Sequence, residues 1–324
     1  MNMTLNPQSA PFDRTILTIT KALFGKLPRL SKCFSEVNYC VVLSFDDGTA
    51  DRVFKLANRN RGDIEIERYL YPAMRAHGLP VPEIEFTHQD YPQPSAPFLV
   101  MPKFSDYTLA KFCHTNHPAA LRACQASGQF IQDLPSRFTE AFKSFLALEE
   151  LRPLLVQNQQ TLDQEEEPDL RLIREKDPDL AQLIEEHFST LSKSTAKRLT
   201  HGQPHNLNIL ADQQGEICVI DIGGMAMSSP LKDLFMLLAS HNGWLDSTGD
   251  PAQRGAILKG YGELNEADVQ ALHFWEFSFW VINLLAHLRL AQGPDNSPYI
   301  RKKIPRLVAM IRTVAKGEGI IHAL

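Results

Sequence analysis

The feature that most constrains the fold is a polar segment, residues 201–208 (HGQPHNLN), which is followed by Asp221 at the end of an apolar run. The apolar residues of 208–210 and 217–220 lie on either side of a turn signal and predict two short strands. An amide oxygen from Asn208 and a carboxylate from Asp221 would then stand at the ends of one short hairpin, where they can share one Mg²⁺. The pattern therefore predicts a small β island that carries a polar loop.

The N-terminal part of the chain has the pattern of a β-rich unit. Residues 39–45 and 51–56 are apolar runs separated by the turn signal DDGT, and they predict a β-hairpin. A helical pattern follows over residues 62–77, although Pro72 weakens the prediction for its second half. Residues 98–101 (FLVM) then predict a buried strand.

From Thr108 onward the pattern becomes helical. Apolar residues recur at helical spacing in three segments, 121–131, 138–151 and 180–191. The acidic, glutamine-rich segment 157–167 interrupts them, and we interpret its acidic run, residues 163–167, as a solvated loop rather than a cation-binding patch. Residues 274–280 (FWEFSFW) are apolar on nearly every face and predict a core helix. A less favoured interpretation has Trp275 or Trp280 packing against a cationic ligand.

The composition excludes several classes of function. With 324 residues, 44% of them hydrophobic, the chain has room for one large domain or two lobes, and a net charge of -5 leaves no basic excess for a nucleic acid partner. The five cysteines form no C-x-x-C pair, which favours a reducing cytoplasm over a disulfide framework or a zinc site. Residues 1–14 lack a secretory signal pattern, and the apolar stretch 271–290 is interrupted by charged side chains. We therefore expect a cytoplasmic protein with no membrane span and a small-molecule partner.

The order of these segments resembles the aminoglycoside phosphotransferase and choline kinase families. Their catalytic loop reads His-Gly-Asp, four residues, Asn, which residues 201–208 match except at Gln203, and Asp221 matches the aspartate that opens their metal-binding turn. The resemblance implies an α+β, two-lobed, protein kinase-like fold. Its nucleotide-binding lobe would comprise residues 1–103, and residues 104–324 would form a mostly helical lobe with the catalytic loop and the acceptor pocket.

The resemblance also implies roles in binding ATP and Mg²⁺. Lys55 would hold the α- and β-phosphates, and Glu67 would fix Lys55 by an ion pair. Asn208 and Asp221 would be the metal ligands. The alternative is that Lys55 is an exposed strand lysine and Glu67 a solvated helix residue.

Three further positions are implied to contact the nucleotide or to support the loop. Met101 and Lys103 lie in a segment that resembles the connection between the lobes, whose backbone would bond an adenine while an apolar side chain packs on the base. Ser35 lies in the phosphate-covering turn and would donate a hydrogen bond. Residues 229–234 (SPLKDL) resemble the family's segment after the metal turn, in which Asp233 would hold the catalytic loop in place.

Two departures from the family pattern bear on the chemistry. Gln203 replaces the aspartate that accepts or orients the proton of the acceptor hydroxyl, and a carboxamide has no useful basicity. His205 is the alternative proton acceptor, although we interpret it by default as a loop-structuring residue. The phosphate-covering segment 32–38 contains no glycine, and Glu36 would repel a triphosphate if it pointed inward.

We therefore expect an ATP- and Mg²⁺-dependent phosphotransferase that acts on a hydroxyl group of a small metabolite or antibiotic. The alternative is a catalytically impaired pseudokinase, which would bind a nucleotide or a partner protein as a regulatory module. Transfer of a nucleotidyl group is a third interpretation, for which the sequence offers no positive feature.

Overall fold

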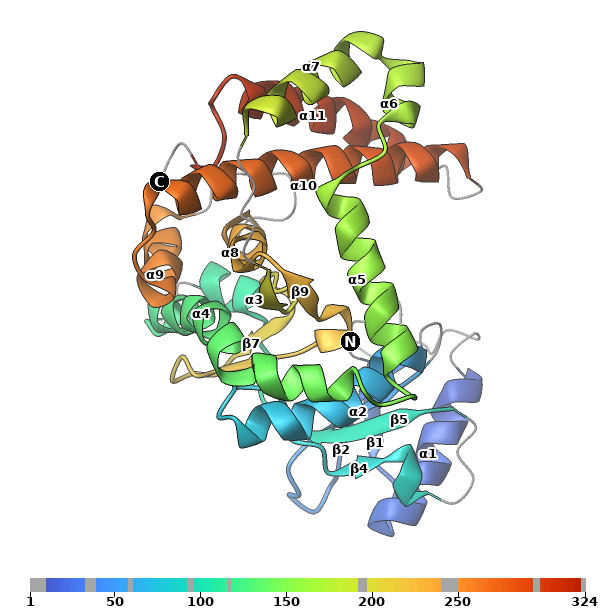
Figure 1. Cartoon of the computed structure of the whole chain (residues 1–324). Helices are drawn as coiled ribbons and strands as arrows, with labels where there is room; N and C mark the ends of the chain where they lie inside the picture. Colours follow the sequence, from blue (N-terminus) through green and yellow to red (C-terminus); the bar gives the residue numbers. More distant parts are fainter. Residues whose placement is uncertain are drawn as a thin grey trace.

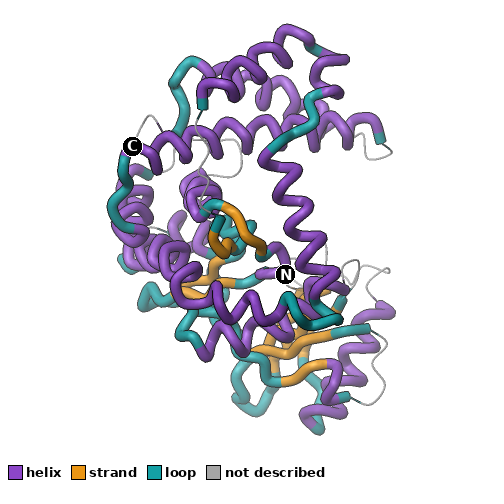
Figure 2. Tube along the Cα trace, in the orientation of Figure 1, coloured by secondary structure: helices purple, strands orange, loops and turns teal. Residues whose placement is uncertain are grey.

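The computed structural model describes residues 10–32, 39–57, 61–91, 96–115, 118–191, 197–239, 250–293 and 298–321. The described chain forms a β-rich N-terminal lobe and a larger, mostly helical C-terminal lobe (Figure 1). Figure 2 shows how strongly the strands are concentrated in the N-terminal lobe and in a small central region of the helical lobe. The predicted α+β, two-lobed fold is confirmed.

A five-stranded antiparallel sheet forms the N-terminal lobe, in the order β1-β2-β3-β5-β4. Its strands are β1 Arg29–Lys32, β2 Tyr39–Ser44, β3 Arg52–Leu56, β4 Phe86–Thr87 and β5 Phe98–Pro102. The predicted hairpin is confirmed as β2 and β3, whose register pairs Tyr39 with Leu56 and Leu43 with Arg52. The central strands are rich in β-branched and aromatic residues, which fit a pleated and largely buried surface.

Helices cover the two faces of this sheet. Helix α1 (Ala10–Phe24) packs on the outer face, away from the helical lobe, and α2 (Arg61–Ala76) packs on the inner face (Figure 1). Side chains of β3 alternate between the faces, so Phe54 joins the outer cluster while its neighbour Lys55 points toward α2. The strand period therefore places Lys55 on the face where the two lobes meet.

Pro72 lies inside α2 without ending it. Helix α2 continues to Ala76, so the expected weakness of its second half is not seen. Leu70, Tyr71 and Met74 from this half are buried in the core, and their burial offsets the backbone hydrogen bond that Pro72 cannot make.

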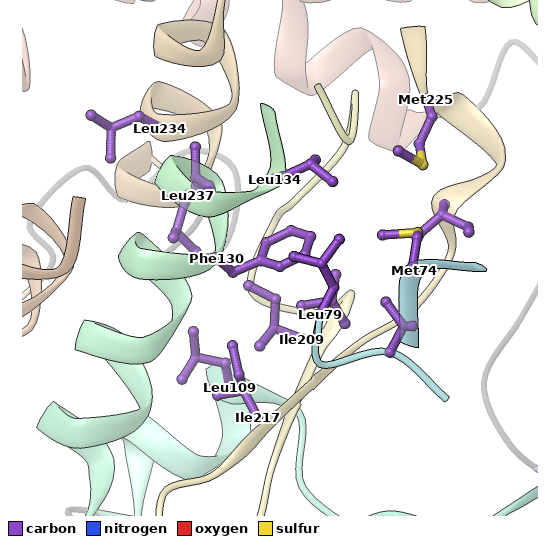
Figure 3. Packing of buried hydrophobic residues seen from close by; sticks show 14 of the residues in the cluster. Met74, Leu79, Leu109, Phe130, Leu134, Ile209, Ile217, Met225, Leu234 and Leu237 are labelled. Atoms are coloured by element: carbon purple, nitrogen blue, oxygen red, sulfur yellow. The ribbon is translucent and has the colours of Figure 1, made fainter. Parts of the chain in front are cut away.

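The C-terminal lobe contains the remaining long helices. They are α3 Leu109–His114, α4 Ala120–Phe145, α5 Arg152–Glu166, α6 Arg171–Lys176, α7 Pro178–Thr190, α8 Pro230–Ala239, α9 Pro251–Tyr261, α10 Glu266–Gln292 and α11 Pro298–Ala315. Helix α4 continues through Pro135 and joins the first predicted helical segment to the start of the second. One hydrophobic cluster surrounds it, in which Phe130 and Leu134 of α4 face Ile209 of the β island and Met74 of α2 (Figure 3).

Helices α4 and α9 pack with their backbones in contact. A Cβ atom added at Gly128 would lie 2.0 Å from the carbonyl oxygen of Ile257, and one added at Gly260 would lie 1.8 Å from that of Gln125. Two glycines, one on each helix, therefore permit the close crossing. No other residue type fits either position without moving a helix.

A second hydrophobic cluster lies at the far end of the helical lobe. It is formed by α6, α7, α10 and α11, and includes Phe277 and Trp280 of the aromatic segment. Trp275 and Trp280 are 3% and 2% exposed, so the interpretation of this segment as core is confirmed. No helix in the described part of the chain is long and apolar enough to cross a membrane.

The interpretation of the acidic run 163–167 as a solvated loop is wrong, because residues 163–166 belong to the end of α5. Its glutamine, leucine and glutamate residues favour helix, and Pro153 is compatible with the first helical turn. Leu155 is buried in the cluster around α4, so the helix contacts the hydrophobic core on one side despite its polar composition. The interpretation from charge alone therefore missed a helix that packs against the cluster around α4.

Two short two-stranded sheets interrupt the helices. They pair β6 (Arg198–Thr200) with β9 (Ala226–Ser228), and β7 (Ile209–Ala211) with β8 (Ile217–Val219). The second pair confirms the predicted β island, whereas β6 and β9 were not predicted. The loop 201–208 connects β6 to β7, and Asp221 follows β8.

Candidate functional site

Asp233 anchors the catalytic loop, which here denotes residues 201–208. Its carboxylate, 1% exposed, accepts the backbone N–H of His201 at 2.6 Å and that of Gly202 at 3.1 Å. Burial raises the pKa of Asp233 to about 7, against the lowering effect of these N–H groups and of Lys232. The start of the loop is therefore tied to α8, as the resemblance implied.

His201 connects the catalytic loop to the end of β8. Its Nε2–H donates to the carbonyl oxygen of Ile220 at 3.1 Å, and its Nδ1 accepts the N–H of Gln203 at 3.2 Å. Both contacts require a neutral ring with its proton on Nε2. Complete burial lowers the pKa of His201 to about 4, so the neutral form prevails at physiological pH.

Asn208 closes the same loop. Its side-chain Nδ2 donates to the carbonyl oxygen of Gln203 at 3.0 Å, and its own carbonyl accepts the N–H of Ile220 at 2.9 Å. Because the amide nitrogen is used within the loop, the amide oxygen Oδ1 is the atom that Asn208 can offer to a cation. The second bond joins Asn208 to Ile220, the residue that precedes Asp221, at the end of the β7–β8 pair.

Asp221 opens a tight turn, called here the metal turn (residues 221–225), that contains the 3₁₀ helix η2 (Ile222–Gly224). With φ 63° and ψ 52°, Asp221 is the one non-glycine residue in the described ranges that has a left-handed backbone. Its backbone N–H donates to the hydroxyl of Tyr71 at 3.0 Å. This strained conformation is held by a hydrogen bond from α2.

Lys55 lies between two carboxylates that come from different lobes. Its Nζ is 2.6 Å from Oε1 of Glu67 and 3.5 Å from Oδ1 of Asp221. Burial alone would lower the pKa of Lys55, but the charges of Glu67 and Asp221 outweigh it and raise this pKa. Burial also raises the pKa of Glu67 to about 7, although Lys55 acts in the opposite direction. The interpretation of Lys55 and Glu67 as exposed residues is therefore wrong.

One face of α2 is directed at this site. Asp63, Glu67 and Tyr71 follow each other at intervals of four residues, so their side chains line one side of the helix. A Cβ atom added at Gly223 would lie 2.7 Å from Oδ1 of Asp63, which shows how closely α2 approaches the metal turn. Tyr71 was not among the residues predicted for the site, and its four-residue spacing from Glu67 was the signal available in the sequence.

The catalytic loop and the metal turn touch each other through their backbones. Gly202 has φ +90°, and a Cβ atom added there would lie 2.3 Å from the carbonyl oxygen of Gly224. Gln203 is exposed, and its Cγ lies 4.0 Å from the position that a Cβ on Gly224 would take. The side chain that replaces the expected aspartate therefore lies beside the metal turn, with solvent access.

Asp221 and Asn208 supply the kind of atoms that Mg²⁺ binds. Asp221 is 44% exposed at its side chain and has a carboxylate oxygen beyond the one that faces Lys55. No group of three or more His, Cys, Asp and Glu that could hold a metal ion occurs among the described residues. Two hard oxygen ligands from protein suit Mg²⁺, which usually keeps several waters and takes phosphate oxygens, so these residues fit that ion.

The chain matches one protein family over most of its length. The sequence profile of the phosphotransferase enzyme family (APH) matches residues 38–275. The chain belongs to this family. A search of curated proteins finds no match.

Solved structures of this phosphotransferase family share the fold at low sequence identity. The GDP complex of aminoglycoside 2'-phosphotransferase-IIIa has a TM-score of 0.62 and 18% identity, covering 94% of this chain and 99% of that one. A choline/ethanolamine kinase family protein from Mesorhizobium loti has a TM-score of 0.63 and 14% identity, covering 97% and 98%. Spectinomycin phosphotransferase in complex with ADP and spectinomycin has a TM-score of 0.59 and 13% identity, covering 94% and 98%.

The family resemblance also assigned Met101 and Lys103 to the nucleotide. Met101 is buried in β5 on the face that packs toward α2. Nζ of Lys103 pairs with Asp51 at 3.2 Å and with Asp106 at 2.6 Å, and the N–H of Lys103 donates to the carbonyl of Asp51 at 3.0 Å. The Nζ and the backbone N–H of Lys103 are thus used within the protein, and its contact with a nucleotide stays a prediction.

Of three further positions considered in the sequence, the structure describes only His205. Ser35 and Glu36, in the phosphate-covering segment of the phosphotransferase pattern, lie outside the described residues. The carbonyl oxygen of His205 accepts the N–H of Asn208 at 2.8 Å, and burial lowers the pKa of the His205 ring. These features agree with the interpretation of His205 as a loop-structuring residue.

A pocket of about 440 Å³ lies elsewhere in the helical lobe. Its lining comes from the α5–α6 connection, α7 and α10: Glu167, Pro168, Leu170, Glu185, Phe188, Leu191 and Phe274. No residue that the sequence assigned to the phosphotransferase site lines it. We therefore keep this pocket separate from the site around Asp221.

Proposed function

We propose that this chain is an ATP- and Mg²⁺-dependent phosphotransferase that acts on a hydroxyl group of a small metabolite or antibiotic. The observation that carries the proposal is the position of Lys55, whose ammonium lies 2.6 Å from Glu67 and 3.5 Å from Asp221. A buried lysine fixed between a helix carboxylate and the residue that opens the metal turn is the arrangement by which protein kinase-like folds bind the phosphates of a nucleotide. Family membership and the nucleotide complexes of similar structures support this assignment.

In the proposed reaction the protein acts mainly by position and charge. Lys55 binds the α- and β-phosphate oxygens of ATP, and Glu67 keeps its ammonium from swinging into solvent. Asn208 through its amide oxygen and Asp221 through its carboxylate would hold Mg²⁺. The ion would neutralise charge on the phosphate oxygens when it is bound.

Gln203 is proposed to orient the acceptor. Its amide oxygen accepts a hydrogen bond from the acceptor hydroxyl and directs the oxygen at the γ-phosphorus. The new bond joins this oxygen to phosphorus, while the bond from phosphorus to the leaving oxygen of ADP breaks. A carboxamide cannot take up the proton of the acceptor hydroxyl. The proton therefore passes to water or to the transferred phosphoryl group. General-base help is worth about 10²- to 10⁴-fold, so we expect slow turnover.

A nucleotide-binding measurement followed by a product assay tests the proposal. ATP with Mg²⁺ at a hundred times its Kd should raise the free energy of unfolding by about 2.7 kcal/mol, which a thermal-shift assay detects. Phosphorylated product should then appear by mass spectrometry with at least one member of a panel of amino alcohols, sugars and aminoglycosides. Asp221→Asn, which keeps the side-chain shape, should abolish the Mg²⁺-dependent part of both signals.

Glu175→Gln is the matched control, because Glu175 is an exposed carboxylate on α6. It should leave both signals unchanged. If the unaltered protein neither binds ATP with Mg²⁺ nor phosphorylates any acceptor, the proposed function is wrong. A product that carries a nucleotidyl group would instead show transfer of a different group.

The alternative proposal is a pseudokinase that binds a nucleotide or a partner protein as a regulatory module. Gln203 favours it, because the carboxamide stands at the place of the expected aspartate. A pseudokinase of this type would show the thermal shift with ATP but no product, and Gln203→Asp would leave it inactive. A measurable rate that rises in Gln203→Asp would instead identify a slow enzyme.

A further inference from the structure

The metal turn is held by α5 as well as by α2. Nδ2 of Asn158 donates to the carbonyl oxygen of Gly223 at 2.5 Å and to that of Met225 at 3.4 Å. One amide group therefore binds two carbonyls of the turn that begins at Asp221. The backbone of the turn has fewer conformational constraints than most segments, since Gly223 and Gly224 are two of its five residues.

The next residue of α5 fastens the strand that follows the turn. Oε1 of Gln159 accepts the N–H of Met227 at 2.9 Å, and Nε2 of Gln159 donates to the carbonyl of Met227 at 3.0 Å. Strand β9 pairs with β6 along its other edge, so Gln159 takes the place of a neighbouring strand at Met227. Asn158 and Gln159 together bind the backbone from Gly223 to Met227.

The position of α5 is itself fixed. Leu155 is 2% exposed and belongs to the cluster around α4, which holds the start of the helix against the core. Farther along, Nε2 of Gln159 donates to Asp163 at 3.0 Å, and Lys197 pairs with Asp163 at 2.9 Å just before β6. Helix α5 is therefore attached to the rest of the protein at Leu155 and at Asp163, and Asn158 lies between these two contacts.

We propose that Asn158 is a positioning residue for the metal site: by holding the carbonyls of Gly223 and Met225, it fixes the direction of the Asp221 carboxylate. This inference rests on the proposed function of Asp221 as a Mg²⁺ ligand. Tyr71 holds the N–H of Asp221 at one end of the turn, and Asn158 holds the other end. Both contacts are made to backbone atoms. They therefore fix the backbone from which the Asp221 side chain extends, without contacting its carboxylate.

The test compares Asn158→Ala and Asn158→Asp with the control Gln160→Ala. Gln160 is exposed on the same helix. The Asp variant keeps the side-chain volume but has no N–H to donate, and its added negative charge would strengthen, not weaken, attraction of Mg²⁺. Weaker Mg²⁺ binding in this variant therefore reports the lost hydrogen bonds.

The first readout is the Mg²⁺ dependence of ATP binding and of the rate. We expect both Asn158 variants to raise the half-saturating Mg²⁺ concentration by about 3- to 10-fold, the loss that one net hydrogen bond represents. ATP affinity measured in EDTA should stay within about 2-fold of the unaltered protein, because the proposal gives Asn158 no contact with the nucleotide. A residue that acted only on stability would lower the active fraction and leave the half-saturating Mg²⁺ concentration unchanged.

The second readout does not need activity. Hydrogen exchange measured by mass spectrometry should be faster in peptides that cover residues 221–228 in both Asn158 variants, and unchanged in Gln160→Ala. Unchanged exchange there, or a Mg²⁺ dependence equal to that of the control, would overturn the inference. If the unaltered protein shows no Mg²⁺-dependent ATP binding, the proposed function fails, and with it the role of Asn158 at a metal site, whereas faster exchange would still establish its hold on the turn.

Discussion

The hydroxyl of Tyr71 accepts the backbone N–H of Asp221 at 3.0 Å, and this bond joins the small lobe to the turn that carries the proposed metal ligand. Tyr71 is 1% exposed, so its hydroxyl is shielded from solvent. The bond therefore holds a left-handed backbone conformation in a buried place, where an unpaired N–H is costly.

Tyr71→Phe should lower the free energy of unfolding by about 1 to 3 kcal/mol, because it leaves the buried N–H of Asp221 without an acceptor. Urea unfolding measures this loss. Tyr69→Phe is the control on the same helix, since the hydroxyl of Tyr69 bonds Glu150 in an exposed place. It should stay within about 0.5 kcal/mol of the unaltered protein. Equal losses in the two variants would contradict the role assigned to Tyr71.

Gln203→Asp should raise the rate of phosphoryl transfer by about 10-fold or more, because a carboxylate beside the metal turn can accept the acceptor's proton. The exposed position of residue 203 makes the ionised side chain acceptable. Initial rates at saturating ATP and Mg²⁺ measure the effect. Gln203→Asn has the size of the Asp variant without its charge, and it should give no gain. A rise of the same size in both variants would show that side-chain length, and not basicity, limits the rate.

His201 should make the protein less stable in acid. Its pKa is lowered by burial to about 4, below the ordinary value of 6.5, so the unfolded chain takes up a proton first as the pH falls. The stabilising effect of the neutral ring is present above about pH 6.5 and is lost as the pH falls toward 4, by roughly 3 kcal/mol in total.

Urea unfolding between about pH 7.5 and 4.5 checks this dependence. His201→Gln should be less stable at neutral pH and should show a flatter loss on acidification, because it has no ring to protonate. His77→Gln, at an exposed position at the end of α2, should keep the full dependence. A parallel pH profile in His201→Gln would assign the acid sensitivity to other groups.

Gly260→Ala should destabilise the protein by about 3 kcal/mol or more, because the added methyl would overlap the carbonyl of Gln125 and force α9 away from α4. Gly255 lies on the same helix, and a Cβ atom added there would have no neighbouring atom within 4 Å. Gly255→Ala should instead stabilise the protein by about 0.5 to 1 kcal/mol through helix propensity. Thermal or urea unfolding of the pair measures the difference, and a Gly260→Ala variant as stable as the unaltered protein would contradict the close crossing.

The sequence predicted those parts of the molecule that depend on local patterns. The hairpin of β2 and β3 follows from two apolar runs and a turn signal. The β7–β8 pair likewise follows from two shorter apolar runs on either side of a turn signal. The loop at 201–208 could be located because it resembles the family's catalytic-loop pattern, His-Gly-Asp, four residues, Asn, except at Gln203. In each case neighbouring residues determine the geometry, so their order in the chain is sufficient.

The remaining features depend on contacts between distant segments. Gln159 contacts Met227 because α5 packs along β9. The polar residues next to Gln159 in the sequence, however, gave the segment the pattern of a loop. Tyr71 has the pattern of a core residue, and only the fold brings its hydroxyl to Asp221. Strands β6 and β9 are separated by the loop 201–208 and by the β7–β8 pair, so no local turn signal joins them. Pairing across the chain, rather than local preference, forms all of them.

Helix α5 also determines how this chain can be recombined with its relatives. It starts against the cluster around α4 and leads to α6, whose residues belong to the cluster at the far end of the helical lobe (Figure 1). A chimera that exchanges the distal helices at a junction before residue 152 would import a foreign α5 and lose the contacts to Gly223 and Met227. A junction after residue 167 keeps them. The boundary suited to exchanging modules therefore lies at the end of α5, not at its start.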